Sequence, residues 1–522
     1  MHWIDPLIAG LVGLVTSIGL IFLILQASRR FNLARRAVEL HHGHSNPVPR
    51  LGGIALAGTV VVVVLLFYIL SGPGFLQQNE RWLVVILSLA MFGLGLWDDL
   101  LVLGARRKLF GQILIASVAF YCGIGILNFK IPFTNQIIDL GLWAWPVTVI
   151  WLVAMTNLIN LIDGVDGLAG GICLMLMILL MYVSVQAGLV PVIAAGLAGA
   201  LLGFLRFNFP PAQIYMGDGG AYFLGFFIGA TTIVTSQKGT VVAALLAPLF
   251  VLALPIIDTS VAILRRGLKG LPLFRPDRSH IHHRLLAAGH SRRKVVLGIY
   301  LFTAFFLVLG FAAFCWHGQY IPLFLGIGAL MILFAAGQFN FSREWLSVGR
   351  VLGNALEARA DIQYAMSLSH WLALEGKRVQ TLGDLAEDVV FIARKLGFDS
   401  VRIRLKDAQK HWPLTEVKAE SCESYRHLLP GHKYCFLELD AVGPGARSSR
   451  AAGVSIITTD RSDILADLVA EGWSKAVADW QKINQLPVRF DSSPVAPAAS
   501  EIDLPKTPPP GGQTSPNRLA NL

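Results

Sequence analysis

Residues 157–167 read Asn-Leu-Ile-Asn-Leu-Ile-Asp-Gly-Val-Asp-Gly and lie between two apolar runs that are each long enough to cross a lipid bilayer. Polar groups at the edge of the hydrocarbon region are costly and usually have a function. They recur here at every third position. Each such step turns the side chain by about −60° on an α-helix, so one helix cannot direct them all to one point. We therefore expect a helix that ends near Asn160, a turn that carries Asp163, and Asp166 as the cap of the next helix.

The composition of the chain indicates a polytopic membrane protein. Of its 522 residues, 54% are hydrophobic and 15% are charged, and the mean hydropathy is +0.60. Soluble proteins of this length rarely have such values. The apolar runs are confined to residues 1–340, whereas residues 341–490 have the composition of a soluble domain. Residues 491–522 are rich in Pro and Ser, and we expect them to be disordered.

Apolar runs of about 20 residues predict eleven spanning helices. They lie at 6–27, 52–71, 83–103, 109–127, 142–160, 168–187, 190–206, 219–236, 240–264, 295–315 and 320–340. Lys and Arg are concentrated in the odd-numbered loops, and the positive-inside rule assigns such loops to the cytoplasm. The N-terminus is then outside and the C-terminal domain is cytoplasmic. Because these loops supply much of the +10 net charge, we expect no nucleic-acid partner.

The soluble domain is expected to be small and of the α+β class. Its predicted elements are helices within 343–378, at 381–396 and at about 464–483, and strands at 400–405, 434–439 and 454–458. This order of elements would suit a sensory domain of the GAF type. The whole chain is therefore predicted to be an all-α polytopic membrane protein with a cytoplasmic α+β domain.

The predicted topology places every polar cluster of the membrane region on the cytoplasmic side, which indicates one composite site. Asp98 and Asp99 are adjacent at a helix end, and such carboxylates repel each other unless a cation lies between them. Lys108 follows nearby and suits phosphate. The alternative is a solvated helix end beside ordinary basic loop residues.

Residues 208–220 form a third polar segment, in which Asp218 is followed directly by a helix. Helix N-termini favour phosphate. An Asp at that place would repel phosphate unless it holds a cation, which points to Mg²⁺. The alternative is an ordinary helix start with glycines for the turn.

The ninth loop contains His and Arg side chains that suit a diphosphate and a sugar. They are Arg278, His280, His282, His283 and Arg284. A plain basic loop and a zinc site are the alternatives, although zinc would lack a nearby Cys.

Together these motifs resemble the polyprenyl-phosphate N-acetylhexosamine-1-phosphate transferases over about residues 1–340. Four motifs occur in the family's order: the Asp98-Asp99 pair, the 157–167 stretch, the 208–220 segment and the His-Ile-His-His loop. The resemblance implies that a membrane-embedded polyprenyl phosphate attacks the sugar-linked phosphate of a UDP-N-acetylhexosamine. The products would be polyprenyl-diphosphate sugar and UMP, and Mg²⁺ would be required, with Mn²⁺ as a second option.

The resemblance also implies a role for each candidate residue. Asp218 and Asn160 would bind the metal ion, Asp98 and Asp99 would orient or activate the lipid phosphate, and Lys108 would bind phosphate. The nucleotide pocket would be lined by Asp163, Asp166 and Asn208. The His and Arg side chains of loop nine would hold the sugar and diphosphate. The candidate catalytic groups are thus Asp98, Asp99, Asp163 and Asp166, and Asn157, Asn160 and Asn208 join the substrate-binding residues.

Within the family, the His-Ile-His-His-Arg form is similar to the branch that uses UDP-GlcNAc and undecaprenyl phosphate for O-antigen and related cell-surface polysaccharides. A FucNAc or QuiNAc derivative, or MurNAc-pentapeptide, stays open as the sugar, as does a one-step or two-step mechanism. The resemblance implies a bacterial inner membrane location with the site on the cytoplasmic face. A homodimer and a cytoplasmic regulator of the C-terminal domain are further partners to test.

Two readings from other classes compete with the transferase. Buried carboxylates and broken helices would also suit a secondary transporter, but transport needs polar groups near the bilayer midplane, and here they gather at one face. The C-terminal domain could instead be the main actor, although eleven spans with four polar motifs exceed what an anchor needs.

Overall fold

A computed structural model describes most of the chain. The described residues are 4–31, 48–72, 81–101, 103–130, 137–236, 248–253, 290–315, 348–406, 408–415, 422–429, 435–442 and 458–490, with a few isolated positions between 256 and 328. The chain divides into two compact units, Met1–Ala360 and Asp361–Leu522.

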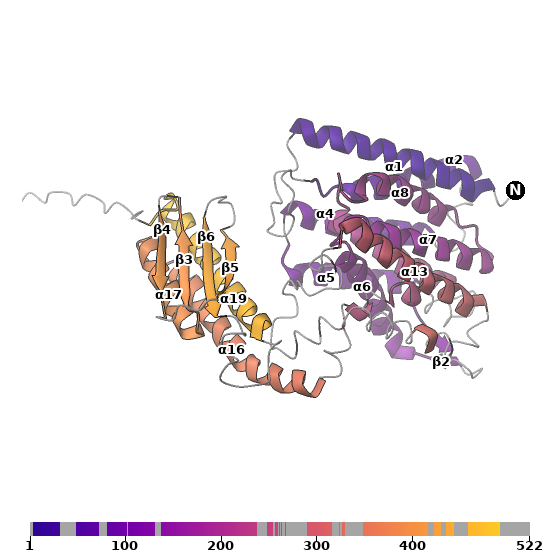
Figure 1. The fold of residues 1–522 in the computed structure, drawn as a ribbon. Coiled ribbons are helices and arrows are strands. Elements are labelled where there is room, and N and C mark those ends of the chain that lie inside the picture. Colours follow the sequence, from indigo (N-terminus) through magenta and orange to yellow (C-terminus); the bar gives the residue numbers. More distant parts are fainter. Residues whose placement is uncertain are drawn as a thin grey trace, which may run out of the picture. The chain divides into compact units, whose positions relative to one another are not determined.

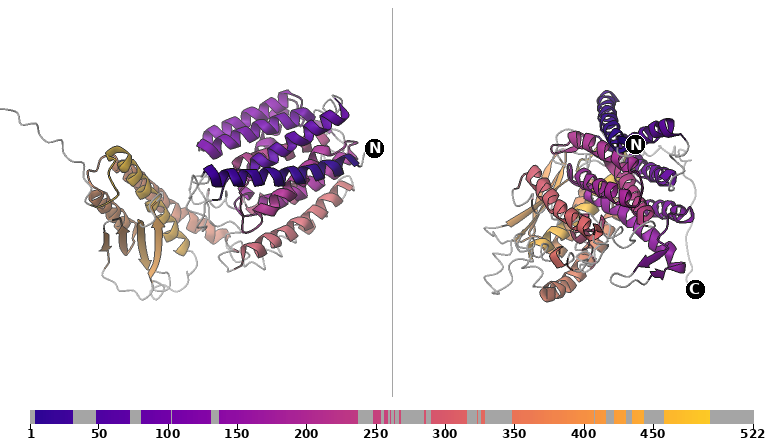
Figure 2. Two further views of the ribbon diagram at one scale, coloured as in Figure 1. Left: turned by 90° about the horizontal axis from the view of Figure 1, so that it is seen from above. Right: turned by 90° about the vertical axis from the view of Figure 1, so that its right-hand side faces the viewer.

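The first unit is a bundle of long helices (Figure 1). They are α1 (Ile4–Phe31), α2 (Gly52–Ser71), α4 (Arg81–Leu101), α5 (Ala105–Tyr121), α6 (Ala144–Ile162), α7 (Leu168–Gln186), α8 (Val192–Asn208), α9 (Gly217–Ser236) and α13 (Arg292–Cys315). A short hairpin of β1 (Asn128–Lys130) and β2 (Ile137–Asp139) and a 3-10 turn, η3 (Gly141–Trp143), connect α5 to α6. The view from above shows the long helices running side by side (Figure 2).

Seven of the described helices are long and apolar enough to cross a membrane, and α8 is a shorter apolar helix. The prediction of a polytopic helical membrane protein is therefore confirmed. The predicted runs at 240–264 and 320–340 fall largely outside the described residues. The number of eleven spans and their orientation stay predictions.

Helix α9 is the centre of the bundle, because 94% of its most apolar stretch is buried, against 22% for that of α1. It packs against α2, α4, α6 and α7. Close approach to α4 depends on Gly95, where a Cβ atom would lie 2.5 Å from the carbonyl oxygen of Asp218. The N-terminus of α9 is thereby held against the C-terminal end of α4.

The second unit contains a four-stranded antiparallel sheet in the order β4-β3-β6-β5. The strands are β3 (Ser400–Arg404), β4 (Gln409–Pro413), β5 (Cys422–Leu428) and β6 (Phe436–Val442). The helices are α17 (Leu382–Leu396), α19 (Thr458–Asn484) and the part of α16 (Val348–Glu375) that follows residue 360. Helices α17 and α19 contact the sheet, and alternate strand residues such as Val401, Ile403 and Leu439 are fully buried. The predicted helix at 381–396 is confirmed, and Thr381 caps it with Asp384 in a reciprocal capping box.

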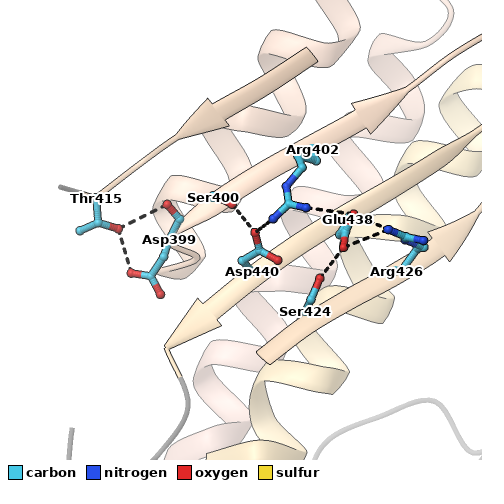
Figure 3. Close-up of polar contacts among 8 residues, drawn as sticks. All are labelled: Asp399, Ser400, Arg402, Thr415, Ser424, Arg426, Glu438 and Asp440. Atoms are coloured by element: carbon cyan, nitrogen blue, oxygen red, sulfur yellow. Dashed lines mark hydrogen bonds and ion pairs between the residues drawn. The ribbon is translucent and has the colours of Figure 1, made fainter. Parts of the chain in front are cut away.

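Charged side chains alternate on the face of the sheet that is turned away from the helices (Figure 3). Arg402 lies 2.8 Å from Asp440 and 3.6 Å from Glu438, and Arg426 lies 3.1 Å from Glu438. Both carboxylates are more than nine-tenths buried, so each is neutralised by a guanidinium of a neighbouring strand. Strand β5 and edge strand β4 were not predicted. Of the predicted strand at 454–458, the structure describes only Thr458, which begins α19.

Candidate active site

Lys108 joins two of the predicted acidic motifs at one end of the bundle. Its ammonium group pairs with Asp98 of α4 and lies 3.1 Å from Oδ2 of Asp218 in the first turn of α9. Asp98 is 8% exposed and also accepts a hydrogen bond from the backbone N–H of Leu103. The ammonium of Lys108 thus offsets the charges of Asp98 and Asp218, and does not lie between Asp98 and Asp99 as the sequence suggested.

Asp99 contacts a different part of α9. Its two carboxylate oxygens accept hydrogen bonds from the backbone N–H groups of Asp218, at 3.1 Å, and of Gly219, at 2.9 Å. The adjacent residue Asp98 instead faces Lys108. Successive residues of a helix point about 100° apart, so the two neighbours act on different atoms.

Asp163 follows the last residue of α6 and lies close enough to Asp218 and Asp99 for their charges to act on it. Burial raises the pKa of Asp163 well above its ordinary value, and the neighbouring carboxylates raise it further, while Arg50 opposes the rise. Four carboxylates therefore gather here against the charges of Lys108 and Arg50. Arg50 was not among the predicted site residues, although it stands two residues before Gly52, where α2 begins.

The prediction that Asp166 caps the helix after the turn is wrong. Gly167 occupies the capping position of α7 with a φ of 79°, a conformation that favours glycine. The Asp166 carboxylate accepts a hydrogen bond from the N–H of Ala212, at 3.2 Å, and lies 3.5 Å from Arg292 of α13. Asp166 is 6% exposed and so connects the turn to the segment before α9.

Asn208 is the last residue of α8 and is 2% exposed. Its Oδ1 accepts from the N–H of Gly167 at 2.9 Å, and its Nδ2 donates to the carbonyl of Ile214 at 2.8 Å. Tyr300 of α13 donates to the carbonyl of Gly167. Both hydrogen-bonding ends of Asn208 are therefore used within the protein, and this clamp was not apparent from the sequence.

The two remaining carboxamides lie on α6. Asn157 donates to Oε1 of Gln112, at 2.7 Å, and to the carbonyl of Val153. Gln112 is 1% exposed, and its place as a lone amide in an apolar run could have indicated this pair. Asn160 lies in the last turn of α6, and within the described part of the chain its side chain makes no hydrogen bond.

The histidine loop cannot be placed beside these groups. Its candidate residues, Arg278, His280, His282, His283 and Arg284, lie outside the described residues. Their predicted contact with a sugar and diphosphate stays a prediction.

The excess of carboxylates fits a divalent cation. Among the described residues, no group of three or more His, Cys, Asp or Glu side chains is arranged as a metal site. Mg²⁺, however, is commonly held by one or two carboxylates together with waters and substrate phosphates. Asp218 could serve in this way, because its carboxylate lies in the first turn of α9 and is 22% exposed.

Comparisons with known proteins match the part of the chain that carries these residues. Residues 81–236, which run from α4 to the end of α9, match glycosyl transferase family 4. The matched range contains the acidic residues from Asp98 to Asp218 and the lysine between them.

Several curated proteins are similar to the chain. A Bacillus subtilis protein named "Probable undecaprenyl-phosphate N-acetylglucosaminyl 1-phosphate transferase" is 33% identical over 344 residues, which cover 64% of this chain and 94% of the relative. The decaprenyl-phosphate N-acetylglucosaminephosphotransferase of Mycobacterium tuberculosis is 33% identical over 50% of this chain and 70% of its own length. The phospho-N-acetylmuramoyl-pentapeptide-transferase of Listeria innocua is 32% identical over 49% of this chain and 81% of its own length. The chain therefore belongs to glycosyl transferase family 4, among the polyprenyl-phosphate N-acetylhexosamine-1-phosphate transferases.

Proposed function

We propose that the membrane unit transfers a sugar-1-phosphate from a UDP-N-acetylhexosamine to undecaprenyl phosphate. An oxygen of the lipid phosphate attacks the phosphorus that bears the sugar, the bond from that phosphorus to UMP breaks, and UMP leaves. The observation that carries the proposal is the ammonium of Lys108 held between Asp98 and Asp218 at the N-terminus of α9. The names of the relatives support a polyprenyl-phosphate acceptor and a sugar-phosphate donor.

Phosphoryl transfer requires mainly positioning and neutralisation of charge. The ammonium group of Lys108 can exchange its contact with a carboxylate for a contact with a phosphate oxygen. Asp98 contacts Lys108 directly and sets the place of this charge. Asp163 extends the acidic wall from the end of α6.

The proposed cofactor is Mg²⁺, with Asp218 as its first ligand and Asn160 as a second. When bound, the ion would neutralise the diphosphate of the nucleotide sugar. Asn160 is suited to this role because its carboxamide makes no hydrogen bond within the described residues, and amide oxygens are ordinary ligands of hard cations.

UDP-GlcNAc is the proposed donor, and cell-surface polysaccharide synthesis at the cytoplasmic face of the inner membrane is the proposed setting. The GlcNAc named in the first relatives supports this choice, whereas the Listeria relative keeps MurNAc-pentapeptide open. A transporter is less well supported, because Lys108 and its carboxylates lie at helix ends.

The test is release of UMP by purified protein supplied with Mg²⁺, undecaprenyl phosphate and, separately, UDP-GlcNAc, UDP-FucNAc, UDP-QuiNAc and UDP-MurNAc-pentapeptide. We expect UDP-GlcNAc to give the highest kcat/KM. If another UDP-sugar is preferred, UDP-GlcNAc is the wrong donor, but transfer of a sugar-1-phosphate to undecaprenyl phosphate still holds. If none of them yields UMP, the proposed function is wrong.

A further inference from the structure

Asp99 provides the cap of a helix to which it does not belong. The first N–H groups of a helix have no partner within it, and a capping side chain commonly comes from the residue just before the helix. At the start of α9 the residue with a non-helical φ is Gly217, and glycine has no side chain that could accept from these groups. Both oxygens of Asp99, on α4, accept from the N–H groups of Asp218 and Gly219 instead.

The surroundings of Asp99 leave little room for α9 to move. A Cβ atom on Gly95, one turn earlier on α4, would lie 2.5 Å from the carbonyl oxygen of Asp218. Gly217 has a φ of 76°, and a Cβ atom there would lie 2.7 Å from Oδ2 of Asp99. The backbone of Asp218 is therefore held against α4 at two points, by the hydrogen bond from its N–H to Asp99 and by the close approach of its carbonyl to Gly95.

The hydrogen bond from the Asp218 backbone to Asp99 is important because the carboxylate of Asp218 forms an ion pair with Lys108. A hydrogen bond at the backbone N–H of Asp218 fixes the point from which its side chain starts, and so sets which positions the carboxylate can reach. We propose that Asp99 is a positioning residue, which holds the Asp218 carboxylate beside Lys108, and that it does not contact the lipid phosphate. The expected change in kcat rests on the proposed function, whereas the expected changes in amide exchange and Mn²⁺ binding rest on geometry alone.

The substitution Asp99→Asn tests the inference with little change in shape. An Asn side chain can accept only one of the two hydrogen bonds, and its NH₂ group would then face an N–H donor. Amide exchange in a peptide covering residues 216–222 should become about fivefold faster, as expected for loss of a helix cap. Mn²⁺ binding to the purified protein, followed by electron paramagnetic resonance, should weaken by about tenfold, as for other groups that orient a metal ligand.

A second variant moves α9 while Asp99 stays intact. Gly95→Ala should weaken Mn²⁺ binding in the same direction, because its methyl group pushes the Asp218 backbone away from α4. Gly93→Ala is the matched control, since a Cβ atom there meets nothing within 4 Å. The control should leave amide exchange and Mn²⁺ binding unchanged.

Kinetics separate positioning from contact with the lipid. For Asp99→Asn we expect kcat to fall while the KM for undecaprenyl phosphate stays within about twofold, since uniform binding is unaffected. A KM for undecaprenyl phosphate raised tenfold or more, with unchanged exchange and Mn²⁺ binding, would overturn the inference. So would faster exchange with unchanged Mn²⁺ affinity, which would mean a cap of structural importance only. If the wild-type protein releases no UMP, the proposed function fails, while exchange and Mn²⁺ binding still decide the role of Asp99.

Discussion

Replacement of Asn208 by alanine should loosen the segment before α9. The side chain is buried and bonds to two buried backbone groups, the N–H of Gly167 and the carbonyl of Ile214. Alanine leaves both groups without a partner. A stranded buried group costs about 1–3 kcal/mol, so the variant should lose about 2–6 kcal/mol of stability.

The assay is thermal unfolding in detergent, combined with amide exchange of peptides covering residues 163–168 and 209–216. Leu202→Ala is the control on the same helix, because Leu202 is 51% exposed and such substitutions are usually within about 0.5 kcal/mol. The family resemblance implied that Asn208 lines the nucleotide pocket. An unchanged stability and exchange, with a KM for the UDP-sugar raised tenfold, would refute the clamp and favour that pocket.

Three further perturbations test other parts of the account. Lys108→Gln removes the cation between two carboxylates, so Mn²⁺ should bind more tightly while kcat falls by about 100-fold; weaker Mn²⁺ binding would contradict the arrangement. Tyr300→Phe removes the hydrogen bond to Gly167 and should cost about 1 kcal/mol, seen as faster exchange in residues 163–168 but not in the C-terminal unit. Burial alone would raise the pKa of Asp440, but the Ser400 hydroxyl and the Arg402 guanidinium bring that pKa below its ordinary value. The resulting stability is present above the unfolded pKa of about 3.9 and is lost as pH falls through the folded pKa. Asp440→Asn should therefore speed exchange in residues 400–442 at pH 7, and the difference from wild type should vanish in strong acid; a difference that persists there would count against the ion pair.

The long helices were predictable because uninterrupted apolar runs leave few alternatives in a bilayer. The run predicted at 52–71 is α2, and that at 168–187 is α7 to within a residue. The edge strand β4 was missed because Gln409–Pro413 has no alternation of apolar and polar residues. Such a strand is defined by its partner β3 and not by its own sequence.

The gathering of polar groups at one end of the bundle was also predictable from the sequence. Lys and Arg in alternate loops assigned each loop to one side of the membrane, and every polar motif fell on the same side. The partners of individual side chains did not. The capping of α9 by Asp99 and the bond from Ala212 to Asp166 join residues far apart in the chain, and the first depends on how closely two helices pack while the second joins two connecting segments. Adjacent aspartates look equivalent in sequence, and only tertiary packing assigns them different partners.

The central claim is that Asp218, held against Lys108 at the start of α9, is required for transfer of the sugar phosphate. Its most direct test compares wild-type protein with Asp218→Asn for UMP release from UDP-GlcNAc in the presence of Mg²⁺ and undecaprenyl phosphate. The variant is expected to keep the thermal unfolding midpoint to within a few degrees and to lose UMP release by at least about 100-fold. A folded variant that releases UMP at the wild-type rate would contradict it.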